Sequence, residues 1–234
     1  MHIADGLLDP ITIIVLWIIT ILFLVFGFFR MGKIFEEEDS EKLIPYIGVL
    51  AAIIFAFQFV NYPIIGGTSG HFIGGTLVAV ILGPWASVIL LFLVLVVQSL
   101  FGDGGITALG ANTFNMGIIG GFIGYYFVLI LIRIFNKLKI REELKISIAT
   151  GIGSYFAVLL ASLFCGIELS IAGVIPIEIA IPAMVYWHVV IGIGEAIISA
   201  LIVFYIYKAK PELIITQCIL RVDKKCLEIP NIKG

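Results

Sequence analysis

Three histidines occur in this chain of 234 residues, and one of them, His2, directly follows Met1. A histidine at the second position can offer one metal ion three nitrogen donors: its imidazole, its own backbone amide and the free amine of Met1. These donors close fused five- and six-membered chelate rings and lie near one plane once the amide has lost its proton. His71 can supply the fourth nitrogen that the plane lacks.

The donor set restricts which metal fits. Four nitrogens in a plane suit Cu(II) or Ni(II), whereas zinc prefers a tetrahedral site and Mg²⁺ prefers oxygen ligands. The chelate requires a free amine, and we expect Met1 to be the mature N-terminus because neither a basic n-region nor a small-residue cleavage site marks a removable signal peptide. In the competing interpretation His2 is merely exposed and His71 merely caps a helix.

His71 ends the glycine-rich stretch NYPIIGGTSGH, residues 61–71. Glycines allow the backbone to fold back into a protein-lined pocket at membrane depth, but they also permit close helix packing. The stretch alone favours packing. The presence of a second histidine at position 2 favours the metal site.

The composition predicts a multi-pass membrane protein, because 61% of the residues are hydrophobic and only 13% are charged. We expect an all-α bundle of seven transmembrane helices, the third short and ended by the break at Gly83-Pro84. We assign residues 1–210 to the membrane domain and 211–234 to a short cytoplasmic tail. The predicted segments are Ile11–Phe29, Leu43–Val60, Phe72–Leu82, Pro84–Phe101, Thr113–Phe135, Ile146–Cys165 and Ile181–Tyr207.

The lysines and arginines predict the orientation, because cytoplasmic loops collect them. All 14 fall after the first span, after the fifth span or in the tail, which places them on one side. The N-terminus and the loops 61–71, 102–112 and 166–180 lie on the other side and carry only acidic charge. Met1 and His2 therefore face outward, and the C-terminus is cytoplasmic.

The start MHIADG, the loop GGTSGH, the segment GDGGITALGANTFNMG and the stretch WHVVIGIGEA together resemble the CbiM/NikM family. Its members are the substrate-binding S subunits of energy-coupling factor (ECF) transporters for cobalt and nickel. The resemblance covers nearly the whole chain. It implies a cell-membrane protein that holds Ni²⁺ or Co²⁺ through Met1, His2 and His71, and the sequence does not choose between the two metals.

The resemblance also implies partners: a transmembrane coupling (T) subunit, ABC-type ATPase subunits and a small accessory membrane subunit, with no nucleic acid. The chain contains no G-x-x-x-x-G-K-[ST] motif, so ATP hydrolysis is expected from other chains. We therefore expect a transporter subunit and not an enzyme. Its metal is cargo and not a catalytic cofactor.

Several other polar residues are candidates for supporting the ligands. Asn112 and Asn115 could orient an imidazole or the N-terminal segment, although Asn112 is also a common helix N-cap. Ser69 lies two residues before His71 and belongs to the same candidate group. His188 and Glu195, seven residues apart, share one helix face, and we expect structural or supporting roles for both. Glu195 needs a partner or a proton, because a bare carboxylate in a bilayer is costly.

Two alternative functions stay open. Ser69, within Gly67-Thr68-Ser69-Gly70, could form the dyad of a rhomboid-like intramembrane serine protease with His188. That reading leaves His2 and His71 unexplained. A passive metal channel is the other alternative, and weak metal binding would distinguish it.

Overall fold

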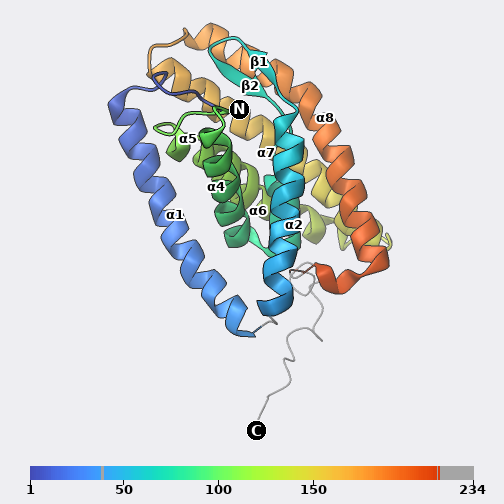
Figure 1. Cartoon of the computed structure of the whole chain (residues 1–234). Helices are drawn as coiled ribbons and strands as arrows, with labels where there is room; N and C mark the ends of the chain where they lie inside the picture. The colour runs from blue at the N-terminus through green and yellow to red at the C-terminus, as the bar shows by residue number, and fades with distance from the viewer. Residues whose placement is uncertain (38–39, 215, 217–234) are drawn as a thin grey trace.

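A computed structural model describes residues 1–37, 40–214 and 216 of the chain, and Figure 1 shows a helical bundle with a small β-hairpin at one end. The predominantly helical fold class is confirmed, whereas the hairpin was not predicted. The elements in chain order are α1 (Pro10–Glu37), α2 (Ser40–Phe59), β1 (Tyr62–Ile64), β2 (Thr68–Gly70), α3 (Gly75–Leu82), α4 (Pro84–Leu100), α5 (Leu109–Thr113), the π-helix η1 (Phe114–Ile123), α6 (Gly124–Phe135), α7 (Glu142–Ile171), α8 (Ile177–Ala209) and the 3₁₀-helix η2 (Pro211–Leu213).

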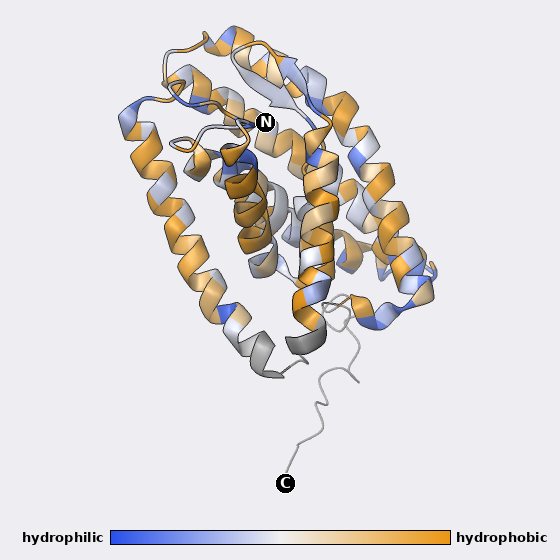
Figure 2. Ribbon diagram, viewed as in Figure 1, coloured by the Kyte–Doolittle hydropathy of each residue, from blue (hydrophilic) through white to orange (hydrophobic). Residues whose placement is uncertain are grey.

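Within the described residues, four helical stretches are long and apolar enough to cross a membrane. They are Pro10–Gly32, Leu109–Phe135, Glu142–Ile171 and Ile177–Ala209. Two shorter apolar helices, Leu43–Phe59 and Pro84–Leu100, accompany them. Hydrophobic residues follow the outer faces of α1 and α8 in Figure 2, as lipid contact requires. The count of seven spans and the outward N-terminus stay predictions.

The short helix α3 lies inside the bundle, and all eight of its residues are buried. The predicted start at Phe72 was wrong, because the helix begins at Gly75 after Gly74 adopts a left-handed conformation with φ of 75°. A glycine tolerates this conformation at little cost. His71 therefore lies in a non-helical loop, from which its side chain can reach the N-terminus of the chain.

The predicted helix Thr113–Phe135 is longer and irregular: α5, η1 and α6 follow one another without a break from Leu109 to Phe135. The π-helical part packs directly on α3. A Cβ atom at Gly75 would lie 2.6 Å from the Met116 carbonyl oxygen, so only glycine fits between the two backbones. The Thr76 hydroxyl donates a hydrogen bond of 2.6 Å to the Gly120 carbonyl across this contact. π-Helical turns often occur at functional sites.

The hairpin β1–β2 is antiparallel and pairs Tyr62 with Gly70. Its turn uses Gly66 and Gly67, whose φ angles of 99° and 75° favour glycine. Sequence analysis treated the whole stretch as a loop, because strands of three residues give too little alternation to be recognised. The hairpin holds Ser69 on its second strand and delivers the chain to His71.

The last two long helices extend beyond their predicted ends and pack closely on each other. Ile146–Cys165 is part of α7, and Ile181–Tyr207 is part of α8, so the predicted loop 166–180 shrinks to residues 172–176. Pro182 lies within α8. The first tail residues also contact the bundle, since the Tyr46 hydroxyl donates to the Leu213 carbonyl over 3.1 Å. The domain division at residue 210 stays a prediction, and residues 215 and 217–234 of the tail lie outside the described part of the chain.

Candidate metal site

The N-terminal segment does not lie on the surface but enters the bundle beneath the hairpin, where Figure 1 marks the start of the chain. Met1 and Ile3 are fully buried, and His2 is 4% exposed. The Asn112 side chain holds the segment through two hydrogen bonds to one residue. Its Oδ1 accepts the Ile3 amide at 2.8 Å, and its Nδ2 donates to the Ile3 carbonyl at 3.1 Å.

A second clamp holds the segment slightly closer to the surface. The Gly105 amide donates to the Ile3 carbonyl over 2.9 Å. The Asp5 carboxylate accepts the amides of Ile106 at 3.1 Å and Thr107 at 2.7 Å, and the Thr107 hydroxyl as well. These hydrogen bonds, with the side chain of Thr107 the largest contributor, lower the pKa of Asp5. Residues 3–5 are thus fixed on both sides, which determines where residues 1 and 2 lie.

The Met1 nitrogen lies 2.7 Å from Nε2 of His71, and it also donates to the Ser69 carbonyl. His71 is 2% exposed, so this contact is shielded from water. With metal–nitrogen bonds of about 2.0 Å, adjacent donors in a square plane lie about 2.8 Å apart. The two nitrogens form a hydrogen bond in this structure, and their separation also equals the spacing of two neighbouring ligands of one planar metal ion.

Each imidazole has at least one ring nitrogen beside a hydrogen-bond acceptor. Nδ1 of His71 lies 2.8 Å from the Phe72 carbonyl, to which it can only donate. Nε2 of His2 lies 3.1 Å from Oε1 of Gln98, which likewise accepts. A neutral imidazole that donates from one nitrogen has a lone pair on the other. The free lone pair of His71 is then on Nε2. Nδ1 of His2, which closes a six-membered chelate ring with the His2 amide, faces the Asp103 carboxylate at 3.1 Å; it has a lone pair for a metal ion when the ring proton is on Nε2, where Gln98 accepts it.

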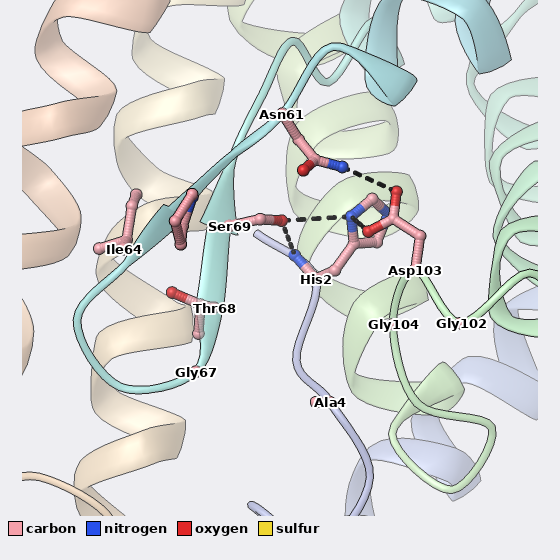
Figure 3. A pocket seen from close by; sticks show the side chains of 11 residues that line it. His2, Ala4, Asn61, Ile64, Gly67, Thr68, Ser69, Gly102, Asp103 and Gly104 are labelled. Carbon is pink, nitrogen blue, oxygen red and sulfur yellow. Dashed lines mark hydrogen bonds and ion pairs between the residues drawn. The ribbon is translucent and has the colours of Figure 1, made fainter.

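Two nitrogens of His2, its backbone amide and Nδ1, face the Ser69 hydroxyl, as Figure 3 shows. Both the His2 amide and Nδ1 lie 3.3 Å from the Ser69 hydroxyl oxygen. Oδ1 of Asp103 lies 3.1 Å from Nδ1. The His2 and His71 rings stack with their centroids 4.3 Å apart. The structure thus places the Met1 amine beside Nε2 of His71, and the two His2 nitrogens beside the Ser69 hydroxyl on the neighbouring hairpin strand.

Burial has a chemical consequence for these donors, because it disfavours their protonated forms. Burial lowers the pKa of the Met1 amine to about 5. Burial also lowers the pKa of His2, and it lowers the pKa of His71 well below its ordinary value. Burial thus favours the neutral forms of these groups, which are the forms that bind a metal ion.

A pocket of about 310 Å³ lies above His2 and is drawn in Figure 3. Its walls come from the hairpin, the 102–104 loop and the N-terminal segment. Asp103 lines it and receives a hydrogen bond of 2.9 Å from the Asn61 side chain. An ion in this pocket would therefore lie near both a carboxylate and His2.

The other candidate residues divide into two groups. Ser69 and Asn112 contact the N-terminal segment as described above. Asn115 instead donates to Glu168 over 2.7 Å, and Nδ1 of His188 lies 2.7 Å from the Met184 carbonyl. Among the described residues, Nε2 of His188 has no hydrogen-bond partner.

Sequence reasoning missed Gln98, which lies one turn before the end of α4 and contacts His2. A polar side chain inside the apolar run LVLVVQSL was the available signal. It also did not identify the partner of Glu195. That carboxylate accepts the backbone amides of Ile73 and Gly74.

The structure argues against the protease dyad. The Ser69 hydroxyl contacts His2. Of the two His188 ring nitrogens, Nδ1 lies against the Met184 carbonyl, and Nε2 has no hydrogen-bond partner among the described residues. The dyad between Ser69 and His188 is therefore not formed.

The family described as "cobalt uptake substrate-specific transmembrane region" (CbiM) matches residues 2–213 of this sequence. The chain belongs to the CbiM family. Membership in this family, with the apolar helices, makes it a multi-pass transmembrane component of metal uptake and not an enzyme.

Individual relatives agree with this assignment. A putative fused nickel transport protein NikMN of Archaeoglobus fulgidus is 40% identical over 92% of this CbiM-family chain and 68% of its own length. A putative metal transport protein of Methanocaldococcus jannaschii is 36% identical over 91% of this chain and 94% of its own. A crystal structure described as a transition metal transporter superposes with a TM-score of 0.78 at 37% identity, covering 95% of this chain and 99% of that one.

The Asn112 clamp generates a prediction about the N-terminus of this CbiM-family protein. Asn112→Leu leaves the Ile3 amide and carbonyl without their side-chain partner, which costs about 1–3 kcal/mol. We expect the buried segment to open roughly ten- to a hundredfold more often, since about 1.4 kcal/mol corresponds to tenfold. The measurement is the rate at which an amine-reactive ester modifies Met1, followed by mass spectrometry of the N-terminal peptide.

Asn115→Leu is the matched control, because Asn115 lies on the same helical stretch but bonds to Glu168. Its Met1 modification rate should stay near that of the parent. Equal rates in the parent and Asn112→Leu would show that the clamp does not hold the segment.

Proposed function

We propose that this protein captures Ni²⁺ or Co²⁺ at an outward-facing site and is the substrate-binding subunit of an ECF-type, ATP-driven importer. The proposed ligands are the Met1 amine, the His2 amide, Nδ1 of His2 and Nε2 of His71. The observation that carries the proposal is the burial of the Met1 amine beside His71, with the His2 ring stacked on that of His71. The 2.7 Å separation between the Met1 nitrogen and His71 is its central element.

The charges around the site support a divalent cation. Binding through the amide removes its proton and leaves one negative charge on that nitrogen. Asp103, 3.1 Å from Nδ1 of His2, contributes a second. Together they neutralise a doubly charged ion, which reduces the cost of placing it in a buried site. The described residues at this site contribute no lysine or arginine to oppose it.

The metal is inferred from ligand chemistry and relatives. Planar nitrogen ligation favours Ni(II) and Cu(II) over zinc and magnesium. The description of the matching family names cobalt uptake, and that of the Archaeoglobus fulgidus relative names nickel transport. Nickel and cobalt are therefore the proposed cargo, and copper is the competitor that the donor set alone does not exclude.

The coupling to ATP is inferred from what the sequence contains. No P-loop motif occurs in it, so energy for accumulation is proposed to come from ABC-type ATPase subunits through a transmembrane coupling subunit, with a small accessory membrane subunit. The resemblance to S subunits supports these partners. A channel needs no such partners and no tight binding site.

The ligand assignment predicts that His2→Ala and His71→Ala each abolish tight Ni²⁺ binding while the protein stays folded. His2→Ala removes the six-membered ring, and His71→Ala removes the only donor from outside the N-terminal segment. Calorimetric titration of purified protein with an untouched N-terminus measures the affinity, and a thermal melt without metal tests the fold.

Thr20→Val is a suitable control, because Thr20 is buried in α1 and bonds only to the Gly110 carbonyl. Its Ni²⁺ affinity should match that of the parent. Unchanged affinity in His71→Ala would eliminate the proposed fourth ligand.

The subunit assignment predicts that the purified chain binds metal but does not accumulate it. In sealed vesicles, we expect ATP-dependent accumulation of radioactive Ni²⁺ only after a coupling subunit and ATPase subunits are added. The His71→Ala protein with the same partners is the control and should accumulate little. Accumulation by the chain alone with ATP would contradict the assignment, and passive equilibration of Ni²⁺ through it would favour a channel.

A further inference from the structure

Glu195 is a buried carboxylate in the middle of α8, 2% exposed, and it points at the loop that carries His71. Each oxygen accepts one backbone amide: Oε2 accepts that of Ile73 at 2.7 Å, and Oε1 accepts that of Gly74 at 2.9 Å. The residues joined by these bonds are more than 120 positions apart in the chain. We propose that Glu195 is a positioning residue that orients His71 for the metal, an inference that rests on the proposed metal site.

The connection runs through a single peptide group. The Phe72 carbonyl and the Ile73 amide belong to the same planar unit, which is rigid because of its partial double bond. Glu195 binds the N–H end of this unit at 2.7 Å, and Nδ1 of His71 donates to its carbonyl end at 2.8 Å. The orientation of the imidazole is thus set by a peptide group whose other end is fixed by Glu195.

Side chains from two other helices hold this loop where it enters α3. The N-cap of α3, Gly74, has no side chain to accept the free amides of the first turn. Glu195 accepts from α8 the two amides just before that turn, those of Ile73 and Gly74, and the Gln58 side chain donates from α2 to the Ile73 carbonyl over 2.7 Å. Hydrogen bonds from α2 and α8 therefore hold the loop immediately beside the peptide group that orients His71.

The Glu195 carboxylate also raises the basicity of the His71 imidazole. Metal-bound histidines commonly donate their second nitrogen to a carboxylate or carbonyl, which fixes the ring and raises its donor strength. Here a carbonyl receives the proton, and a carboxylate polarises that carbonyl through the shared peptide group. Hydrogen bonds in such a chain strengthen one another. Glu195 thereby supports Nε2 of His71 without touching the metal.

The test is a double-substitution cycle on the full chain with an untouched N-terminus. Glu195→Gln keeps the size of the side chain but loses its charge and one of its two acceptors. We expect its Ni²⁺ affinity to fall roughly 10- to 100-fold. We also expect the visible absorption band of the bound Ni²⁺ to move to longer wavelength, because His71 becomes a weaker donor.

In the His71→Ala background, where binding is weak and is measured at high metal concentration, Glu195→Gln should change the affinity little. A residue that merely stabilises the bundle would reduce affinity by the same factor in both backgrounds. Ser199→Ala is the matched control, since Ser199 lies one turn further along α8, is buried and has no hydrogen-bond partner among the described residues. Its affinity and absorption band should be those of the parent.

If Glu195→Gln does not yield folded protein, Glu195→Asp provides the same comparison, because its shorter side chain cannot reach both amides. An equal loss in the two backgrounds, or no loss in either, would overturn the positioning role alone. Parent-like affinity in the single variant His71→Ala would overturn the metal site itself and this inference with it.

Discussion

The arrangement depends on one contact: the Met1 amine buried against Nε2 of His71. An amine in such a place is costly if it keeps its charge, so burial favours the neutral form, which is the form that binds metal. The same burial requires the first residues to pass into the bundle and to have their backbone groups satisfied there. Asn112 and the 105–107 loop meet that requirement. The chain end is thereby a fixed structural part of the site.

The irregular backbone around the site follows from the same constraint. His71 reaches the amine because it lies on a loop and not on a helix, and the loop is stable at this depth because Glu195 and Gln58 satisfy its polar groups. Behind it, α3 lies against η1 with glycine at the closest approach. Lipid-exposed loops of this kind do not occur within a membrane, but a loop enclosed by protein is allowed. The bundle provides that enclosure.

Hydropathy predicted the apolar membrane helices, and position in the chain singled out His2 and His71, whose rings the structure stacks on each other. The sequence did not predict the hairpin, whose strands are too short for a pattern, or the start of α3, which depends on the conformation of Gly74. Glu195 was recognised as needing a partner, but that partner is a pair of backbone amides more than 120 residues away, which no local pattern encodes. Asn115 bonds to Glu168 from another helix, and Nδ1 of His188 lies against the Met184 carbonyl one turn earlier in α8, so a supporting role for these two residues stays a prediction.

The central claim is that the free Met1 amine is a metal ligand, and the most direct measurement compares Ni²⁺ affinity with and without a single glycine before Met1. Both proteins carry their purification tag at the C-terminus, so every side chain is the same. The extension turns the amine into an amide, which is a far poorer donor, and adds atoms to a fully buried position. We predict that the extended protein loses tight Ni²⁺ binding while its metal-free melting shows a folded bundle. Equal affinities of the two folded proteins would contradict the account, because a site built only from the His2 and His71 side chains tolerates the extension.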